Sequence, residues 1–129
     1  MKITKTTQLV VLTPDRPGQL AAILGPVSKA KINVLAYAGY TQAGRGHVML
    51  VTEQNAKAAA VLKKAGFRAR SEPVVVFVAG DVVGSGARIA AKIAKAGVSL
   101  KQAYATGAGG KYLTVLQGRN NARLVAALR

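Results

Sequence analysis

The sequence predicts an α+β protein in which one βαββαβ unit occurs twice, and two observations lead to this prediction. The 129-residue chain matches itself without a gap at an offset of 66 residues. Both copies also show the same succession of strand-like and helix-like apolar patterns. The offset aligns identical residues along the two copies: Asp15 with Asp81, Gly18 with Gly84, Ile23 with Ile89, Gly44 with Gly110, Leu50 with Leu116 and Asn55 with Asn121. A unit of this kind is ferredoxin-like, an antiparallel sheet with both helices on one face.

The first unit is expected to span residues 1–71. The apolar run Leu9–Leu12 predicts a buried strand, and the turn formers of Thr13–Gly18 end it. Apolar residues at helical spacing then predict a helix from Gln19 to Ala30. The remaining elements are expected in this order: strand Val34–Tyr40, hairpin Thr41–Gly46, strand His47–Thr52, a helix capped by Asn55 and stopped by Gly66, and a short edge strand Phe67–Ser71 before Pro73.

The second unit, residues 72–129, is expected to repeat this order. Its elements are strand Val74–Ala79, loop Gly80–Gly84, helix Ser85–Ala96, strand Val98–Thr106, hairpin Gly107–Lys111, strand Tyr112–Gln117 and helix Asn120–Leu128. No residues remain for a last strand. Because Phe67–Ser71 falls on Met1–Lys5 at the repeat offset, we expect Met1–Lys5 to supply that edge strand.

The composition argues against catalysis. Half of the residues are apolar, which suffices for a core, but the chain has no cysteine, one histidine and four acidic residues. These residues cannot assemble a convincing nucleophile–base pair, paired carboxylates or a metal site. No apolar run is long enough to cross a membrane, and Met1–Thr6 lacks the apolar core of a signal peptide. We therefore expect a cytoplasmic protein that is not an enzyme and needs no cofactor.

A net charge of +15 leaves two interpretations open. It is either a feature of solubility or the basis for binding nucleic acid or another polyanion. Arg88, Lys92 and Lys95 lie at helical spacing beside an apolar stripe, so they form either a solvated helix face or a row of phosphate contacts.

Asp15, Pro17, Gly18 and Leu20 form a motif after the first strand, and Ile32-Asn33-Val34 follows at the entry to the next strand. With these residues in this order, the chain resembles an ACT domain. The resemblance covers nearly the whole chain as a tandem pair. It implies a regulatory module that binds an amino acid where two units meet, so the expected partners are this ligand and a second copy in a homodimer. The second copy departs from the motif, because Asp81–Gly86 lacks the proline and Ser99 stands where asparagine is expected.

Physical chemistry supports a site at the same loop. A glycine before a helix lets a ligand approach the backbone, where free N–H groups and the helix dipole favour a carboxylate. A nearby acid or amide can hold an ammonium group, so an amino acid matches both ends. The expected ligand-binding residues are Asp15, Arg16, Gly18, Gln19, Leu20, Asn33 and Val34, with Asp81, Gly84, Ser85 and Ser99 at the repeated site.

Each of these residues also has a structural interpretation. Asp15 is a good helix cap, Gly18 and Gly84 suit a tight turn, and Asn33 can cap a loop. His47 aligns with Leu113 in the repeat, which favours a packed strand residue over a catalytic base.

Two nucleotide-binding motifs match poorly. Gly84–Arg88 lacks the end of a phosphate-binding loop, and Arg45–Val51 lacks the aromatic residues with which RNA-recognition domains stack bases. The tyrosines beside the hairpins remain candidates for such stacking.

Overall fold

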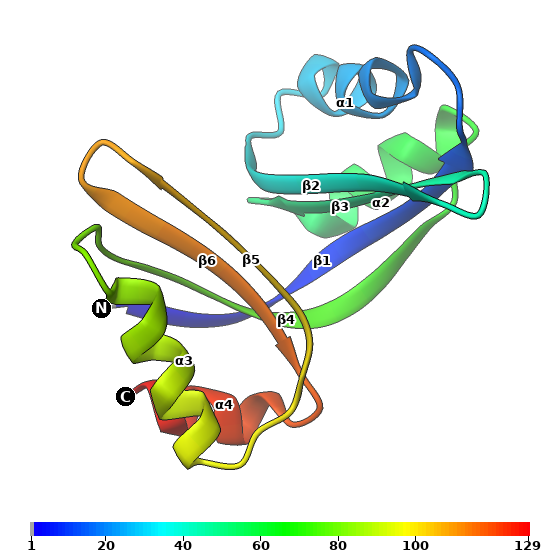
Figure 1. Cartoon of the computed structure of the whole chain (residues 1–129). Coiled ribbons are helices and arrows are strands. Elements are labelled where there is room, and N and C mark those ends of the chain that lie inside the picture. The colour runs from blue at the N-terminus through cyan, green and yellow to red at the C-terminus, as the bar shows by residue number, and fades with distance from the viewer. Residues whose placement is uncertain (1) are drawn as a thin grey trace. The chain divides into compact units, whose positions relative to one another are not determined.

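The computed structural model describes residues 2–129, so Met1, which the predicted edge strand included, lies outside the described residues. The elements follow one another as β1 (Lys2–Pro14), α1 (Gln19–Lys29), β2 (Val34–Gln42), β3 (Arg45–Thr52), α2 (Asn55–Lys64), β4 (Ala69–Gly80), α3 (Ser85–Lys95), β5 (Leu100–Ala108), β6 (Lys111–Gly118) and α4 (Asn121–Leu128) (Figure 1). The strand order is β2-β3-β1-β4-β6-β5. The ladders of β1 with β3, β2 with β3, β4 with β6 and β5 with β6 are antiparallel. This alternation of strands and helices is the predicted ferredoxin-like pattern.

The chain divides into two compact units. The first unit is Thr7–Glu72, and the second unit joins the N-terminal segment that ends at Thr6 to Pro73–Arg129. Strands β1 and β4 each contribute to both units, because each of them runs across a boundary. Each unit thus holds two helices and four strand segments.

The core of the first unit lies between its sheet and its two helices. Leu9 and Val11 of β1 and Val48 and Leu50 of β3 point to the same face, since they alternate along their strands and pair across the ladder. The helices complete the cluster with apolar residues at helical spacing: Ile23 and Val27 from α1, and Ala58 and Leu62 from α2. All four helical residues are fully buried, so both helices are held on one face of the sheet.

The second unit has a core of the same design. Its buried residues come from β4, β6, α3 and α4, and are Val75, Phe77, Ile93, Leu116, Leu124, Val125 and Leu128. Ile3 of β1 packs against this cluster. The N-terminal segment therefore contributes an apolar side chain to the core of the second unit.

One predicted pair of strands is a single strand in the structure. The prediction placed a short strand at Phe67–Ser71, ended by Pro73, and a separate strand after it; β4 instead runs unbroken from Ala69 to Gly80. Pro73 is exposed within this strand. Its fixed φ suits extended backbone, and its missing N–H leaves no buried donor unpaired at an exposed position.

The start of α2 also differs from the prediction. Asn55 was expected to cap this helix, but Gln54 is the N-cap residue and Asn55 is the first helical residue. The Asn55 side chain joins two strands instead, because its Oδ1 accepts from the Thr52 N–H at 2.9 Å and its Nδ2 donates to the Thr7 carbonyl at 2.6 Å. At the other end of α2, Gly66 adopts φ 91°, which confirms it as the residue that stops the helix.

Hydrogen bonds recur at the repeat offset as well. The Glu53 N–H donates to the Asn33 carbonyl at 3.2 Å, and the Arg119 N–H donates to the Ser99 carbonyl at 3.0 Å. Likewise, the Lys57 ammonium reaches the carbonyl of Ala30, and the Arg123 guanidinium reaches that of Ala96. The sequence repeat therefore corresponds to a repeated set of backbone and side-chain contacts.

Candidate functional site

The loop between β1 and α1 leaves the N-terminus of α1 without a side-chain cap. Gly18 is the N-cap residue, with φ 86°, and no side chain accepts a hydrogen bond there. The prediction that Asp15 caps this helix is therefore wrong: the chain turns at a left-handed glycine, and Asp15 lies exposed before that turn. The first N–H groups of a helix have no intrahelical partner, so this end of α1 can receive an anionic group.

A pocket of about 450 Å³ opens at this end of the first unit. We call it the loop pocket. Figure 1 shows that the β1–α1 loop and the β2–β3 hairpin lie at the same end of the unit. The residues that line the loop pocket come from the end of β1, the β1–α1 loop, the first turn of α1, and strands β2 and β3. They are Thr13, Pro14, Asp15, Arg16, Gln19, Leu20, Tyr37, Gly39, Tyr40, Thr41, Gly46, His47 and Val48.

The loop pocket offers groups of both charges. The Asp15 carboxylate and the Arg16 guanidinium are both exposed at its edge. The hydroxyl of Thr13, which is buried, bonds to Oε1 of Gln19 and so fixes the first side chain of α1. An acid, a guanidinium and a helix N-terminus together can bind a molecule that carries a cation and an anion.

His47 packs as a strand residue, as predicted. Its imidazole stacks on the ring of Tyr40, with the ring centroids 4.7 Å apart and the planes 2° from parallel. The two residues face each other across the β2–β3 ladder. This stack forms part of the wall of the loop pocket.

The structure brings together only some of the predicted residues of the first unit. Asp15, Arg16, Gln19 and Leu20 line the loop pocket, and Gly18 adjoins them, whereas Asn33 and Val34 follow the opposite end of α1. An 11-residue helix is about 16 Å long. A single amino acid therefore cannot bridge the loop and Asn33 within one unit.

In the second unit, the corresponding loop between β4 and α3 makes more contacts with its own side chains than the β1–α1 loop does. Gly84 is the N-cap residue of α3 with φ 88°, which matches Gly18. Ser85 is buried, and its hydroxyl donates to the Gly80 carbonyl and accepts from the Val82 N–H. The Asp81 carboxylate lies so close to β5 that a Cβ added at Gly107 would sit 2.5 Å from its Oδ2. Ser85 thus holds the loop in place, and the Asp81 side chain packs against β5.

Other predicted residues of the second unit lie elsewhere. Ser99 is exposed beyond the far end of α3. The guanidinium of Arg88 reaches the Val83 carbonyl and the Ser85 hydroxyl, both at 3.4 Å. Arg88 therefore contacts the loop, while Lys92 and Lys95 are exposed on α3.

Burial raises the pKa of Tyr104, on β5, to about 12. Its hydroxyl thus stays protonated at neutral pH. A tyrosinate at this position cannot act as a base under those conditions.

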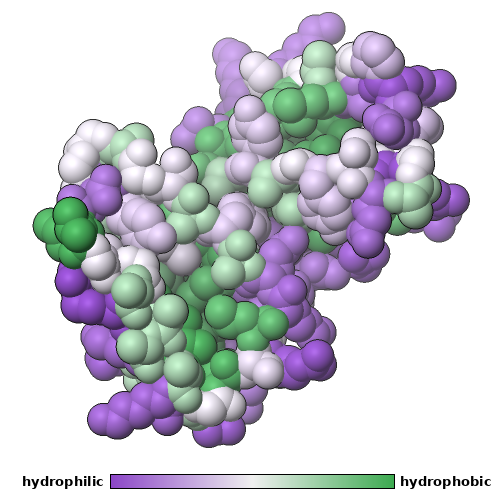
Figure 2. All heavy atoms as spheres, viewed as in Figure 1, coloured by the Kyte–Doolittle hydropathy of each residue, from purple (hydrophilic) through white to green (hydrophobic). Residues whose placement is uncertain are grey.

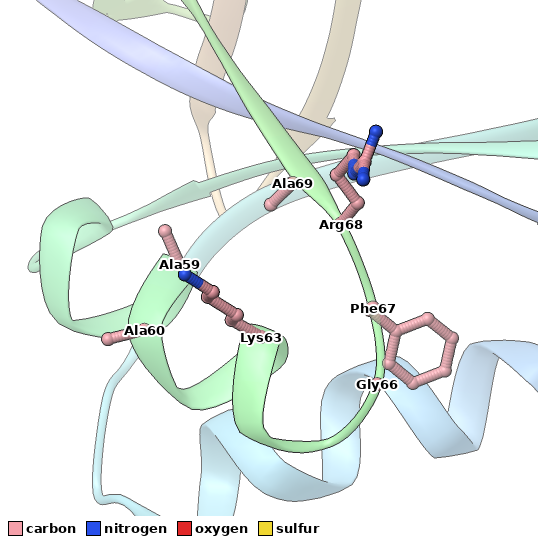
Figure 3. A pocket seen from close by; sticks show the side chains of 7 residues that line it. All are labelled: Ala59, Ala60, Lys63, Gly66, Phe67, Arg68 and Ala69. Atoms are coloured by element: carbon pink, nitrogen blue, oxygen red, sulfur yellow. The ribbon is translucent and has the colours of Figure 1, made fainter.

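A larger hollow, of about 600 Å³, lies beside α2 and the start of β4 (Figure 3). Three of its seven lining residues are alanines. The close-up shows that Lys63 extends along the helix toward Ala59, while Arg68 points away along the strand and Phe67 lies on the other side of the turn. Because its polar groups do not converge, this hollow lacks the arrangement that orients a ligand.

No helix within residues 2–129 is long and apolar enough to cross a membrane. In the same part of the chain, no three metal-ligating side chains come together.

Gly18→Ala is expected to destabilise the first unit by about 1–2 kcal/mol, because a left-handed φ is costly for a residue with a Cβ. Urea denaturation followed by circular dichroism measures the change. Gly80→Ala is the matched control: that glycine has no left-handed φ and open space around it, so its effect should stay within about 0.5 kcal/mol. Equal effects of the two substitutions would contradict the assignment of strain to the loop.

The fold is shared with several crystal structures. Protein BT0572 from Bacteroides thetaiotaomicron superposes with a TM-score of 0.90 at 21% identity, over 98% of this chain and 88% of that chain. The ligand-free regulatory subunit of aspartate kinase from Thermus thermophilus gives 0.71 at 13% identity, over 97% of this chain and 93% of that one. The structure of aspartokinase alpha and beta subunits gives 0.68 at 18% identity, covering 100% and 93% of the respective chains.

No protein-family model matches the sequence, and no curated protein sequence matches it. The similarity therefore concerns the arrangement of the elements. It extends over nearly the whole chain, and one of the proteins that share it is the regulatory subunit of aspartate kinase from Thermus thermophilus. The chain thus has the fold of the ACT-type regulatory domains of aspartate kinase, the fold that the Asp15–Leu20 and Ile32–Val34 motifs implied.

Proposed function

We propose that this protein is a non-catalytic regulatory protein made of two ACT-type units, and that the loop pocket of the first unit binds an amino acid. One observation carries the proposal: the uncapped N-terminus of α1 opens at a pocket that also presents Asp15 and Arg16. The regulatory subunit of aspartate kinase from Thermus thermophilus, which shares this fold, supports it.

Each charged end of the ligand has a partner in this arrangement. The carboxylate binds the free N–H groups of the first turn of α1 and the Arg16 guanidinium, and the ammonium group binds the Asp15 carboxylate. Leu20 and Tyr37 offer apolar contact to the ligand's side chain, since both are exposed and line the pocket. The binding requires no reaction of the ligand.

In this proposal, the Asn33 that contacts the ligand belongs to a second copy of the chain. Because Asn33 lies a helix length from the loop of its own unit, it contacts the same ligand only when another unit presents it. We therefore propose a cytoplasmic homodimer with the ligand between copies. Such a ligand regulates by stabilising the paired arrangement, to which it binds more tightly than to the separate copies.

The net charge of +15 supports a second candidate, a protein that binds nucleic acid or another polyanion through exposed lysines such as Lys92 and Lys95. The two candidates differ in their response to salt. Polyanion binding falls steeply with salt concentration because counterions are released. Binding in a pocket of a few charges falls much less.

The test is a thermal-shift screen against the twenty amino acids, with short DNA and RNA at two salt concentrations. A ligand that binds only the folded protein raises the melting temperature in proportion to the logarithm of its concentration. We expect one or a few amino acids to do so with little dependence on salt. A salt-sensitive shift from nucleic acid alone would instead favour the polyanion candidate.

Asp15→Asn and Arg16→Gln are expected to weaken the binding of that amino acid by about ten-fold or more, since each removes a charged hydrogen bond. Isothermal titration calorimetry measures the affinity. Glu53→Gln and Arg119→Gln are the controls, because they remove the same charges at exposed positions outside the loop pocket. The proposed site is wrong if the controls weaken binding as much as Asp15→Asn and Arg16→Gln do.

A further inference from the structure

A second hollow lies between α3 and strands β5 and β6 of the second unit, with a volume of about 400 Å³. We call it the α3 groove. We propose that it binds a small, mainly apolar molecule that carries one hydrogen-bonding group, such as a substituted aromatic ring. The proposal is independent of the loop pocket, which belongs to the first unit.

The groove exists because α3 has smaller side chains than its counterpart α1 at two aligned positions. At the repeat offset, Leu20 and Leu24 of α1 correspond to Gly86 and Ala90 of α3, and both of these line the groove. The burial of two aligned isoleucines differs accordingly. Ile23 of α1 is fully buried, whereas its counterpart Ile89 of α3 is only partly buried and lines the groove. The second unit thus lacks a counterpart of Leu24, which packs against the core of the first unit, and also lacks the side chain of Leu20.

A buried hydroxyl in the groove has no partner. Thr114 of β6 is only 5% exposed, lines the groove, and its Oγ1 makes no hydrogen bond. It is the one such buried side-chain atom found within residues 2–129. An unpaired buried hydroxyl is unfavourable, and its counterpart in the first unit is Val48, which needs no partner. The Thr114 hydroxyl therefore indicates that a ligand in the groove would supply a hydrogen-bonding group.

The other walls of the groove fit an apolar molecule. Ile93 and Leu116 supply buried aliphatic surface, and Ala103 and Ala105 of β5 leave space because their side chains are short. Figure 2 shows green, apolar residues gathered along α3 and the adjoining part of β5, in the lower part of the view. At the N-terminal end of α3, Tyr112 comes near Gly86, where an added Cβ would be 3.0 Å from its hydroxyl.

Charge excludes other ligand classes from the groove. None of its lining residues carries a charge at neutral pH, although the chain as a whole carries +15. A phosphate or a free amino acid would leave its charges unpaired there. A volume of about 400 Å³ is also within the range of small-molecule pockets.

The test compares 4-methylphenol with toluene, which has the same ring but no hydrogen-bonding group. Binding is followed through the backbone amide shifts of the full chain by NMR. We expect 4-methylphenol to bind with a dissociation constant of about 1 mM or tighter, to shift amides of α3, β5 and β6, and to bind about five-fold more tightly than toluene.

Four variants locate the contacts. Ala90→Leu restores the side chain that α1 has at Leu24, and it should abolish binding of both probes; Ala91→Leu, on the same helix but outside the groove, should leave both unchanged. Thr114→Val should remove the preference for 4-methylphenol without lowering the melting temperature, and Thr114→Ser should keep it.

The proposal is overturned if 4-methylphenol shifts no amides of the groove, if Ala91→Leu weakens binding as much as Ala90→Leu, or if Thr114→Val keeps the preference. It is also overturned if sedimentation shows a dimer that Ala90→Leu dissociates, because the groove would then hold a second copy of the chain. The loop-pocket proposal is unaffected by any of these results.

Discussion

Deleting residues 1–6 is expected to unfold the second unit while the first unit stays folded. Residues 2–6 of the deleted segment are the part of β1 that belongs to the second unit, where β1 neighbours β4 in the sheet. The deletion removes the strand segment that pairs with β4 within the second unit, and it removes the apolar contact of Ile3 with the core of that unit. NMR spectra and amide hydrogen exchange should show the signals of Thr7–Glu72 dispersed and protected, and those of Pro73–Arg129 collapsed or unprotected.

Single substitutions distinguish the contribution of the Ile3 side chain from that of the strand pairing. Ile3→Ala should lower the stability of the second unit by about 1–3 kcal/mol, because a half-buried aliphatic side chain is removed. Lys5→Ala, at an exposed position of the same segment, should change it by less than about 0.5 kcal/mol. If the deletion unfolds both units together, or neither, the segment does not belong to the second unit alone.

The order of the elements could be predicted from the sequence because each unit shows strong local patterns. The apolar run at Leu9–Leu12 and the helical spacing of Ile23 and Val27 identify their elements without knowledge of distant contacts. The extent of β1 is different. Lys2–Thr6 contains one aliphatic residue, so its strand conformation depends on a partner about 70 residues away.

The N-cap of α2, which was wrongly assigned to Asn55, could have been identified by comparing the two copies of the repeat. Asn55 and Asn120 both precede an apolar helical pattern, and Asn120 does cap α4, by accepting from the Arg123 N–H. The offset of 66 residues, however, aligns Asn120 with Gln54 and Asn55 with Asn121. Comparing the two copies would therefore have placed Asn55 inside the helix.

The arrangement of the candidate site could be predicted from the sequence only in part. The turn at Gly18 and its acid and guanidinium follow from local sequence, since they lie within four residues. The distance between Asn33 and this loop follows from the length and direction of α1, which local spacing does not reveal. The α3 groove results from side chains that the second copy lacks, and a hydroxyl without a partner becomes visible only when all of its neighbours are placed.

Asn55→Ala is expected to destabilise the first unit by about 2–4 kcal/mol, the second large effect. Its amide accepts from the Thr52 N–H and hydroxyl and donates to the carbonyl and hydroxyl of Thr7, so one side chain joins β3, α2 and β1. Removing it leaves several of these groups without a partner close to the core. Urea denaturation monitored by circular dichroism gives the change in the free energy of unfolding.

The repeat provides the matched control for this substitution. Asn121 occupies the corresponding place in the second unit, where its Oδ1 accepts from the Gly118 N–H at 2.9 Å. Asn121→Ala should therefore cost about 1 kcal/mol, the contribution of a single hydrogen bond. Because both substitutions replace asparagine by alanine at the first position of a helix, they change the helix propensity equally and differ in the strand contacts. Equal losses of stability would mean that the bonds of Asn55 to Thr7 contribute nothing, and that the amide does not hold β1 to β3 and α2.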